Sequence, residues 1–538
     1  MVMQQRTLNL LAALLLFVIH WQSMAHCRTD VVSSFNVLHY LFELHLNDFT
    51  DKIEGKASVF VHVVCTEEKF TLDLNNFSPS TGKGMQVDEV TVNEKISAFD
   101  HQNNRLDIFS KGGFKQGDTV KIVVKYSGVP ADGLIISENK FGNRTFFADN
   151  WPNRAHFWIP CVDHPSDKAT VEFWVFAPNK YQVIANGSQM EETDLEDGFR
   201  LTRWSETKPV STKIMVIGVA QFAVLNNGIV EGTSVSTWVF PENRQDGFSE
   251  YAVGTKPLAF FSKLIGPFGY SKLAHVQSKT RYGGMENAGA VFYAESTVNG
   301  RADDELLMAH ETAHQWFGDA VTERNWHHLW LSEGFATYLT LVYLKEIAGD
   351  SLYRQRLIAS RKAVNRYEGK KSAPVIDTTV TNYNELLNAN TYQKGAWFLH
   401  MLNHELGDSL FFESLRLYYL IYRDSTALTK DFQHVVEMVS QKNWNSFFHQ
   451  WLFRSGHPKL KTEWSQNGNL LKMNIMQKQL GDPFFFPLTL KFVYTDGRLQ
   501  IETVNISEQL TQLRFKVCAD VKEVIYDPDI SLLFETTF

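Results

Sequence analysis

Two histidines one helical turn apart, His310 and His314, enclose a glutamate at position 311, and a further glutamate, Glu333, follows in the same part of the chain. On a helix, residues i and i+4 project from one face, so both imidazoles can direct a nitrogen at a single ion. Glu333 is placed to supply a third ligand. Two histidines and one carboxylate leave a fourth zinc position open for water, which distinguishes catalytic from structural sites. The spacing therefore predicts a catalytic site with one Zn²⁺ ion.

Glu311 lies between the two histidines and cannot bind the ion with the same geometry. A carboxylate beside the metal can take a proton from a water that the ion activates, and can return it to a leaving amine. We therefore interpret Glu311 as the general base of a hydrolase. The alternative is an accidental HExxH pattern, but the downstream Glu333 makes chance a poor explanation.

The residues around this motif favour a helix that can hold the ligands. Asp303, Asp304 and Glu305 place negative charge at its expected start, where the helix dipole favours it. Apolar residues recur at helical spacing on the side that would face a core: Leu306, Leu307, Ala309, Ala313 and Trp316 or Phe317.

Longer segments around these residues are similar to a known enzyme family. Residues 310–319 and 330–338 resemble the gluzincin aminopeptidases, peptidase family M1, which include aminopeptidase N and leukotriene hydrolase. Further similar segments are, in chain order, 160–163 with 168–170, 283–287, 391–396 and 447–458. Each short match is weak, but their order and spacing together are specific.

The resemblance implies roles for residues outside the metal motif. Glu286 matches the glutamate of the family's exopeptidase motif, which binds the free α-ammonium of the substrate. The residues before it, Gly283, Gly284 and Met285, would lie along the substrate, and glycine allows a close approach. Tyr392 matches the catalytic tyrosine, which would hydrogen-bond the oxyanion. Without the resemblance, Glu286 could be a solvated turn residue and Tyr392 a packing residue.

A second amine-binding position departs from the family pattern. Relatives carry Glu or Gln nine residues before the pair that corresponds to Pro160 and Cys161, and Trp151 stands there in this chain. Asp149 or Asn150 could take over that role, or the aromatic face of Trp151 could contact the ammonium. The sequence leaves these alternatives open. It also leaves open which N-terminal residue of the substrate is preferred.

These residues together predict a zinc-dependent aminopeptidase that hydrolyses the N-terminal bond of peptides with a free N-terminus. A zinc endopeptidase or a dipeptide-releasing peptidase is the first alternative, in which Glu286 does not bind the amine. A peptide-binding protein with a vestigial site is the second, although no motif residue is lost. An epoxide hydrolase side activity like that of leukotriene hydrolase rests on residues 283–287 alone.

Three folded parts are expected after a leader. Residues 26–225 alternate apolar and polar side chains and predict an all-β domain. Residues 226–453 form, by resemblance, a thermolysin-like α/β catalytic domain, and from about residue 250 they show helical periodicity interrupted by a strand-like segment at 274–279. Residues 454–538 return to alternation and predict a small C-terminal β-sandwich, so the fold class is multidomain α+β. Many family members continue with a further helical domain, so we expect a short form with a more open cleft.

Residues 1–25 are typical of a signal peptide. Arg6 precedes an apolar run at 10–19, and small residues precede a cleavage site after Ala25. The run is too short to span a bilayer, so we expect a secreted, periplasmic or extracellular protein without a stable membrane span. A lipid anchor at Cys27 is disfavoured, because His26 is a poor residue before a lipidated cysteine.

Composition fits a large enzyme. The 538 residues are 44% hydrophobic and 21% charged, which allows a sizeable core. The formal charge of −8 and the lack of any basic stretch argue against a nucleic-acid partner. Four scattered cysteines do not form a disulfide framework, and we interpret them as free thiols. The oligomeric state is left open.

Overall fold

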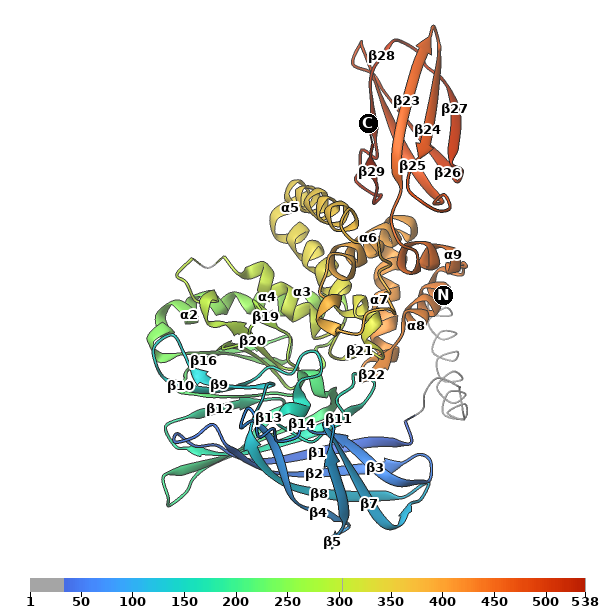
Figure 1. Ribbon diagram of the computed structural model, residues 1–538. Coiled ribbons are helices and arrows are strands. Elements are labelled where there is room, and N and C mark those ends of the chain that lie inside the picture. The colour runs from blue at the N-terminus through green and yellow to red at the C-terminus, as the bar shows by residue number, and fades with distance from the viewer. Residues whose placement is uncertain (1–32, 302, 538) are drawn as a thin grey trace, which may run out of the picture.

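The computed structural model describes residues 33–301 and 303–537, in three parts along the chain (Figure 1). The expected signal peptide and Cys27 lie outside these residues, so export remains a prediction. None of the helices in the described ranges is long and apolar enough to cross a lipid bilayer. Of the cysteines in the described residues, Cys161 is a buried free thiol, and Cys65 and Cys518 are exposed free thiols.

The N-terminal part is built on a long mixed sheet. In β1 (Phe35–His45), Tyr40, Phe42 and Leu44 are buried and the residues between them are more exposed. This period of two is the pattern of a strand with one face on a core. The strand order is β13–β14–β11–β1–β2–β8–β4–β5. The other strands are β2 (Ile53–Val63), β4 (Gly84–Val92), β5 (Lys95–Ile96), β8 (Thr119–Val129), β11 (Lys168–Pro178), β13 (Ser188–Asp194) and β14 (Phe199–Ser211).

Two smaller sheets complete this part. The first has the order β3–β7–β6, with β3 (Glu67–Asp73), β7 (Arg105–Phe114) and β6 (Ala98–Gln102). The second has the order β12–β15–β10–β9, with β12 (Gln182–Ala185), β15 (Ile217–Ala220), β10 (Arg144–Ala148) and β9 (Leu134–Glu138). Short 3₁₀ helices, η1 (Ala155–Phe157) and η2 (Thr212–Ile214), follow β10 and β14.

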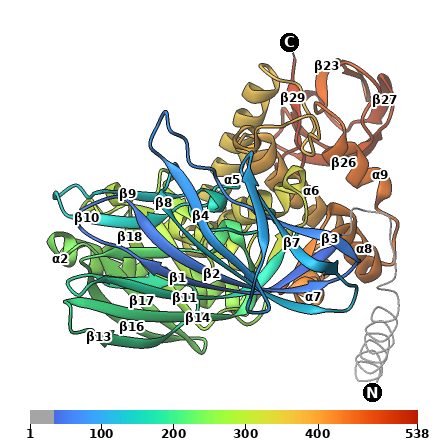
Figure 2. The same cartoon turned by 60° about the horizontal axis from the view of Figure 1, so that its bottom comes forward.

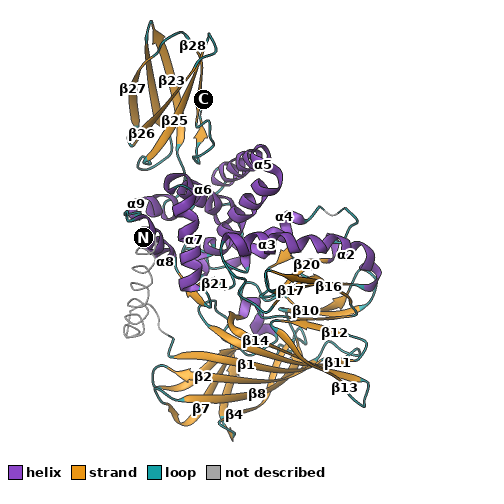
Figure 3. Ribbon diagram, turned by 180° about the vertical axis from the view of Figure 1, so that it is seen from behind, coloured by secondary structure: helices purple, strands orange, loops and turns teal. Residues whose placement is uncertain are grey.

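The middle part combines a five-stranded sheet with helices, which gather beside that sheet (Figure 3). The order is β16–β17–β18–β20–β19, with β16 (Ala223–Val230), β17 (Thr233–Val239), β18 (Lys272–Ser278), β20 (Ala290–Ala294) and β19 (Gly284–Met285). The helices are α2 (Arg244–Tyr251), α3 (Thr255–Leu264), α4 (Glu305–His314), α5 (Trp330–Glu368), α6 (Gly395–Leu406), α7 (Asp408–Tyr422), α8 (Thr429–Ser440) and α9 (Asn445–Phe448). A small pair, β21 (Val321–Glu323) and β22 (Ser425–Ala427), joins the helices.

The C-terminal part consists of two small sheets at the opposite end of the molecule from the N-terminal sheets (Figure 1). Leu471 and Met473 in one sheet and Leu488 and Leu490 in the other are buried. The predicted fold class is therefore confirmed. One sheet contains β27 (Leu510–Lys516), β24 (Leu470–Gln477), β23 (Lys459–Asn467) and β29 (Glu535–Thr536), and the other contains β26 (Leu499–Ile506), β25 (Phe486–Tyr494) and β28 (Val521–Tyr526).

Two lysines, the half-buried Lys168 and the buried Lys213, join the N-terminal part to the middle part, and these two parts lie side by side in Figures 1 and 2. Lys168 Nζ donates to the carbonyl oxygens of Asp319 at 2.8 Å and Ala320 at 2.9 Å. Lys213 Nζ lies 2.6 Å from Glu323 Oε1, and both side chains are fully buried. These contacts fix the segment that follows α4.

Candidate metal centre

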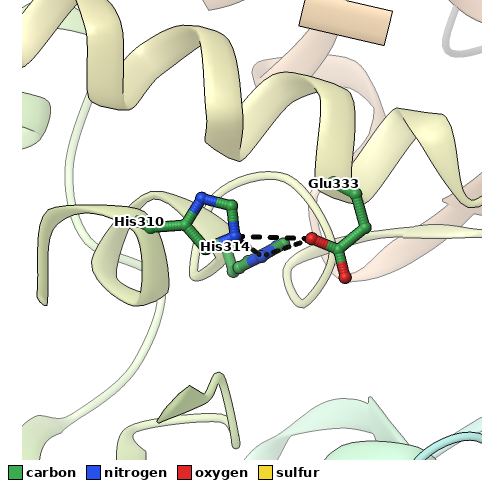
Figure 4. Close-up of side chains that lie close together, drawn as sticks. All are labelled: His310, His314 and Glu333. Carbon is green, nitrogen blue, oxygen red and sulfur yellow. Dashed lines mark hydrogen bonds and ion pairs between the residues drawn. The ribbon is translucent and has the colours of Figure 1, made fainter. Parts of the chain in front are cut away.

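Helix α4 carries His310 and His314 on one face (Figure 4). Its first residue, Glu305, places a carboxylate in the first turn, where the helix dipole favours it. Met308 and Ala309 are buried and anchor the helix in the core. The side chain of His314 is fully buried, whereas that of His310 is 19% exposed. The helix predicted around the motif is confirmed.

Glu333, near the start of α5, completes the cluster. Its Oε2 lies 3.4 Å from His310 Nε2 and 3.2 Å from His314 Nε2, and the two histidine nitrogens are 3.1 Å apart. Ligands about 2.0–2.1 Å from a tetrahedral zinc ion are separated by about 3.3–3.4 Å. The three atoms therefore fit one such ion, and no hydrogen bond to Glu333 Oε2 is formed within the described residues. His310, His314 and Glu333 form a metal-binding group, as predicted.

The cluster favours a positive charge. Burial alone would lower the pKa of His314, but the carboxylates of Glu286 and Glu333 outweigh burial and raise this pKa to about 10. Burial would raise the pKa of Glu333, but the two histidines hold it well below its usual range. A cation is therefore stabilised at this point, which suits a divalent metal ion.

Ser332 contacts the far side of one ligand. Its Oγ lies 2.9 Å from His314 Nδ1. A hydrogen bond at that nitrogen fixes the orientation of the ring and leaves Nε2 free to face the ion. Ser332 was not predicted from the sequence as part of the site, although it directly precedes the ligand Glu333.

We expect Ser332→Ala to weaken zinc affinity about 10- to 100-fold, because His314 loses the partner that orients it. Competition with a chelator of known affinity measures this constant. Ser440→Ala is a matched control, since Ser440 donates to the Val436 carbonyl in α8, away from the metal-binding group. Equal affinities for the wild type and Ser332→Ala would contradict the assigned role.

The two predicted catalytic side chains lie beside the metal-binding group. Glu311 is buried in α4, and burial holds its pKa well above the usual range. Tyr392 lies in a short π-helix, η8 (Asn390–Lys394), and its ring stacks on His310 with centroids 6.2 Å apart. Its hydroxyl also interacts with the Glu333 carboxylate. The structure thus places the Glu311 carboxyl group and the Tyr392 hydroxyl beside the metal-binding group.

The segment from Gly283 to Glu286 forms an open edge of the middle sheet. It contains β19, which pairs with β20 on one side and, within the described residues, with no strand on the other. A Cβ atom on Gly284 would lie 2.5 Å from Glu311 Oε1, so a larger residue would collide with that carboxylate. An open edge can pair with an extended peptide.

The Glu286 carboxylate belongs to the same site. Glu286 is only 5% exposed, and its Oε1 has no hydrogen-bond partner among the described residues. Gln315 Nε2 donates to the Glu286 backbone carbonyl at 2.7 Å and holds the residue in place. Ligand atoms of Glu286, Glu311 and His314 lie within 4.8 Å of one another. A buried, unpaired carboxylate oxygen is suited to binding an ammonium group.

A cavity of about 280 Å³ opens beside these groups. Trp151, Tyr282, Leu307 and Leu387 form part of its lining. Every site residue predicted from the sequence lines it as well: Gly283, Gly284, Met285, Glu286, His310, Glu311, His314, Glu333 and Tyr392.

Of the three candidates for the second amine contact, Trp151 alone is part of this lining. Asp149 is fully buried, and its carboxylate lies 2.7 Å from Arg154 and 3.6 Å from Arg281. Asn150 donates its Nδ2 to two backbone carbonyls and accepts a hydrogen bond from a tryptophan. Asp149 and Asn150 therefore have no free group for a substrate amine.

Two glycines set the distance between Glu333 and Tyr392. Gly334 follows the metal ligand in α5, and Gly395 is the first residue of α6. A Cβ atom on Gly334 would lie 3.0 Å from Gly395 Cα, so the two backbones are in direct contact. Because the two backbones are close-packed, a larger side chain at either glycine would push the two helices apart.

Comparison with known proteins gives matches over most of the chain. Residues 36–214 match the family model described as the peptidase M1 N-terminal domain, and residues 251–451 match the peptidase family M1 domain. Probable aminopeptidase 2 of Sulfurisphaera tokodaii is 26% identical over 71% of this chain and 51% of that protein. The glutamyl aminopeptidase of Homo sapiens is 28% identical over 62% of this chain and 36% of that protein.

A third relative, probable aminopeptidase 1 of Saccharolobus solfataricus, is 23% identical over 92% of this chain and 64% of that protein. The chain thus spans about a third to two thirds of the length of these relatives.

Proposed function

We propose that this chain, which belongs to peptidase family M1, is a zinc-dependent aminopeptidase that removes the N-terminal residue of peptides. The family uses zinc, and His310, His314 and Glu333 provide a group that can hold it. The observation that carries the exopeptidase assignment is the Glu286 carboxylate. It is buried, has an unpaired oxygen, and lies within 4.8 Å of ligand atoms of Glu311 and His314.

The substrate is held at two points. Glu286 pairs with its α-ammonium through a charge-assisted hydrogen bond. The backbone that follows lies along the open edge at Gly284 and Met285. Only two covalent bonds separate the ammonium nitrogen from the first carbonyl carbon, so a peptide anchored by its amine presents its first peptide bond to the metal-binding group.

Glu311 and Tyr392 act on the bond that is cleaved. Zinc, when bound here, supplies a Lewis acid that polarises a carbonyl and makes water more acidic. Glu311 takes the proton from the attacking water and gives it to the departing nitrogen as the C–N bond breaks. Tyr392 donates its hydroxyl hydrogen to the carbonyl oxygen while negative charge develops there.

A pentapeptide with a free or an acetylated N-terminus tests the proposal. We expect acetylation to lower kcat/KM at least about 30-fold, because the acetylated nitrogen has no charge to pair with the buried carboxylate of Glu286. Mass spectrometry should show release of the first residue from the free peptide, and none after exhaustive chelation. Cleavage inside the acetylated peptide would instead identify an endopeptidase.

A further inference from the structure

Trp151 forms a wall of the cavity that also contains Glu286. Its side chain is only 3% exposed, yet it contributes to the cavity surface. Its ring meets that of Tyr282, another lining residue, with centroids 5.9 Å apart and planes at 89°. Trp151 follows β10 of the N-terminal part, whereas Tyr282 precedes β19, so the two parts of the molecule share this wall.

The wall is fixed from behind. Trp326 contacts the Trp151 ring at 6.0 Å with planes at 86°, and Arg154 Nε donates to the Trp151 carbonyl at 2.7 Å. Lys213 Nζ lies 5.7 Å from the centre of the Trp326 ring and is itself held by the buried pair with Glu323. A ring packed on both sides keeps one orientation and presents a defined shape to a ligand.

Charged groups near this wall are paired with one another. Asp132 lies 2.8 Å from Arg154 and 2.7 Å from Arg281, and the same two arginines contact Asp149. None of these four residues is part of the cavity lining. A charged side chain of a substrate would therefore find no partner among them.

The rest of the lining is uncharged once Glu286, Glu311 and the metal-binding group are assigned. It consists of two glycines and six larger residues: Trp151, Tyr282, Met285, Leu307, Leu387 and Tyr392. An apolar side chain gains by leaving water for such a surface. A charged side chain loses its hydration there without gaining a partner.

We propose that Trp151 is a specificity-determining residue that selects peptides whose N-terminal residue has an apolar or aromatic side chain. The ammonium of such a peptide is held by one carboxylate, Glu286, and the indole ring of Trp151 forms the adjoining wall. An aromatic ring attracts a cation without requiring a second charged group. This inference rests on the proposed function and adds the class of substrate.

A panel of aminoacyl amides with leucine, phenylalanine, arginine or glutamate tests the proposal on the zinc-loaded enzyme. For the wild type, we expect kcat/KM for the leucine and phenylalanine amides to exceed that for the arginine and glutamate amides at least about tenfold. Trp151→Gln should lower kcat/KM for the leucine and phenylalanine amides about tenfold. It should leave kcat/KM for the arginine and glutamate amides nearly unchanged. Trp151→Phe should preserve the wild-type order, because the wall stays aromatic.

Trp158→Phe is the matched control. Trp158 is fully buried and donates from Nε1 to Asn150 Oδ1 at 2.9 Å, but it is not part of the cavity lining. Its variant should show the wild-type order, and zinc content and Tm check that each variant is folded. The proposal is overturned if the wild type prefers the arginine or glutamate amide, a result that needs no variant, or if Trp151→Gln keeps the wild-type ratios. Failure of the proposed function has a different signature, since no amide would then be hydrolysed.

Discussion

Glu311→Gln is expected to bind zinc as the wild type does while its turnover falls about 10²- to 10⁴-fold. Glutamine has the shape of glutamate, so it fits against Gly284, whose position leaves no space for a larger rearrangement. It cannot accept a proton, however, and the attacking water then has no base. The kcat for leucine amide tests the expected loss of turnover. The zinc content, measured by mass spectrometry, tests the expected retention of the metal.

Glu305→Gln controls for the loss of one negative charge from the same helix. Glu305 accepts a hydrogen bond from Tyr343 at 2.7 Å in the first turn of α4, and it is not part of the cavity lining. This variant should retain both zinc and turnover. If Glu311→Gln kept its turnover, Glu311 would not be the base; if it lost its zinc, the variant would instead report on metal binding.

Glu286→Gln is expected to lower kcat/KM about 30- to 3,000-fold, mainly through a higher KM. Removing one member of a desolvated charge pair costs about 2–5 kcal/mol of binding free energy. In the proposed function the substrate ammonium is such a partner, because Glu286 is buried and its Oε1 has no hydrogen-bond donor among the described residues. Glu286→Gln should also hydrolyse peptides with a free and with an acetylated N-terminus equally well, a result that is specific to the loss of amine binding.

The ratio of kcat/KM for the free and acetylated pentapeptides is the decisive measurement for Glu286→Gln. The exposed Glu242 provides the matched control, and Glu242→Gln should keep the wild-type ratio. An unchanged ratio in Glu286→Gln would show that this carboxylate does not bind the amine. The exopeptidase assignment would then be wrong even if the enzyme remained active.

The metal-binding group was predictable because its geometry is mostly local. His310 and His314 lie on one helix face because of the helical repeat alone, and the flanking acidic and apolar residues predict the helix. Alternation along the strands likewise predicted both β-rich parts, since burial of one face requires it. Glu333 lies on another helix, so its place as third ligand came from ligand chemistry and from spacing.

Other features of the site depend on contacts between distant segments. The contact of Gly334 with Gly395 brings Tyr392 to the metal-binding group, and no periodicity marks two glycines as neighbours across helices. Asp149 and Trp151 were equal candidates in the sequence, because the choice depends on two arginines that pair with the aspartate, the nearby Arg154 and Arg281 much further along the chain. Side-chain pairing across domains decides such questions, and one sequence alone does not contain it.

Lys168 and Lys213 determine which parts of the chain must stay together. Residues 226–453 contain all three metal ligands, but Lys213, the counter-ion of Glu323, lies outside that range, as does Lys168. Removing Lys213 would leave the Glu323 carboxylate without its cation. Breaking a buried ion pair in this way costs about 3–5 kcal/mol, which is a large fraction of the stability of a typical domain. A shortened version of this chain must therefore retain the N-terminal sheets, because they help to hold the segment that follows the metal-binding helix.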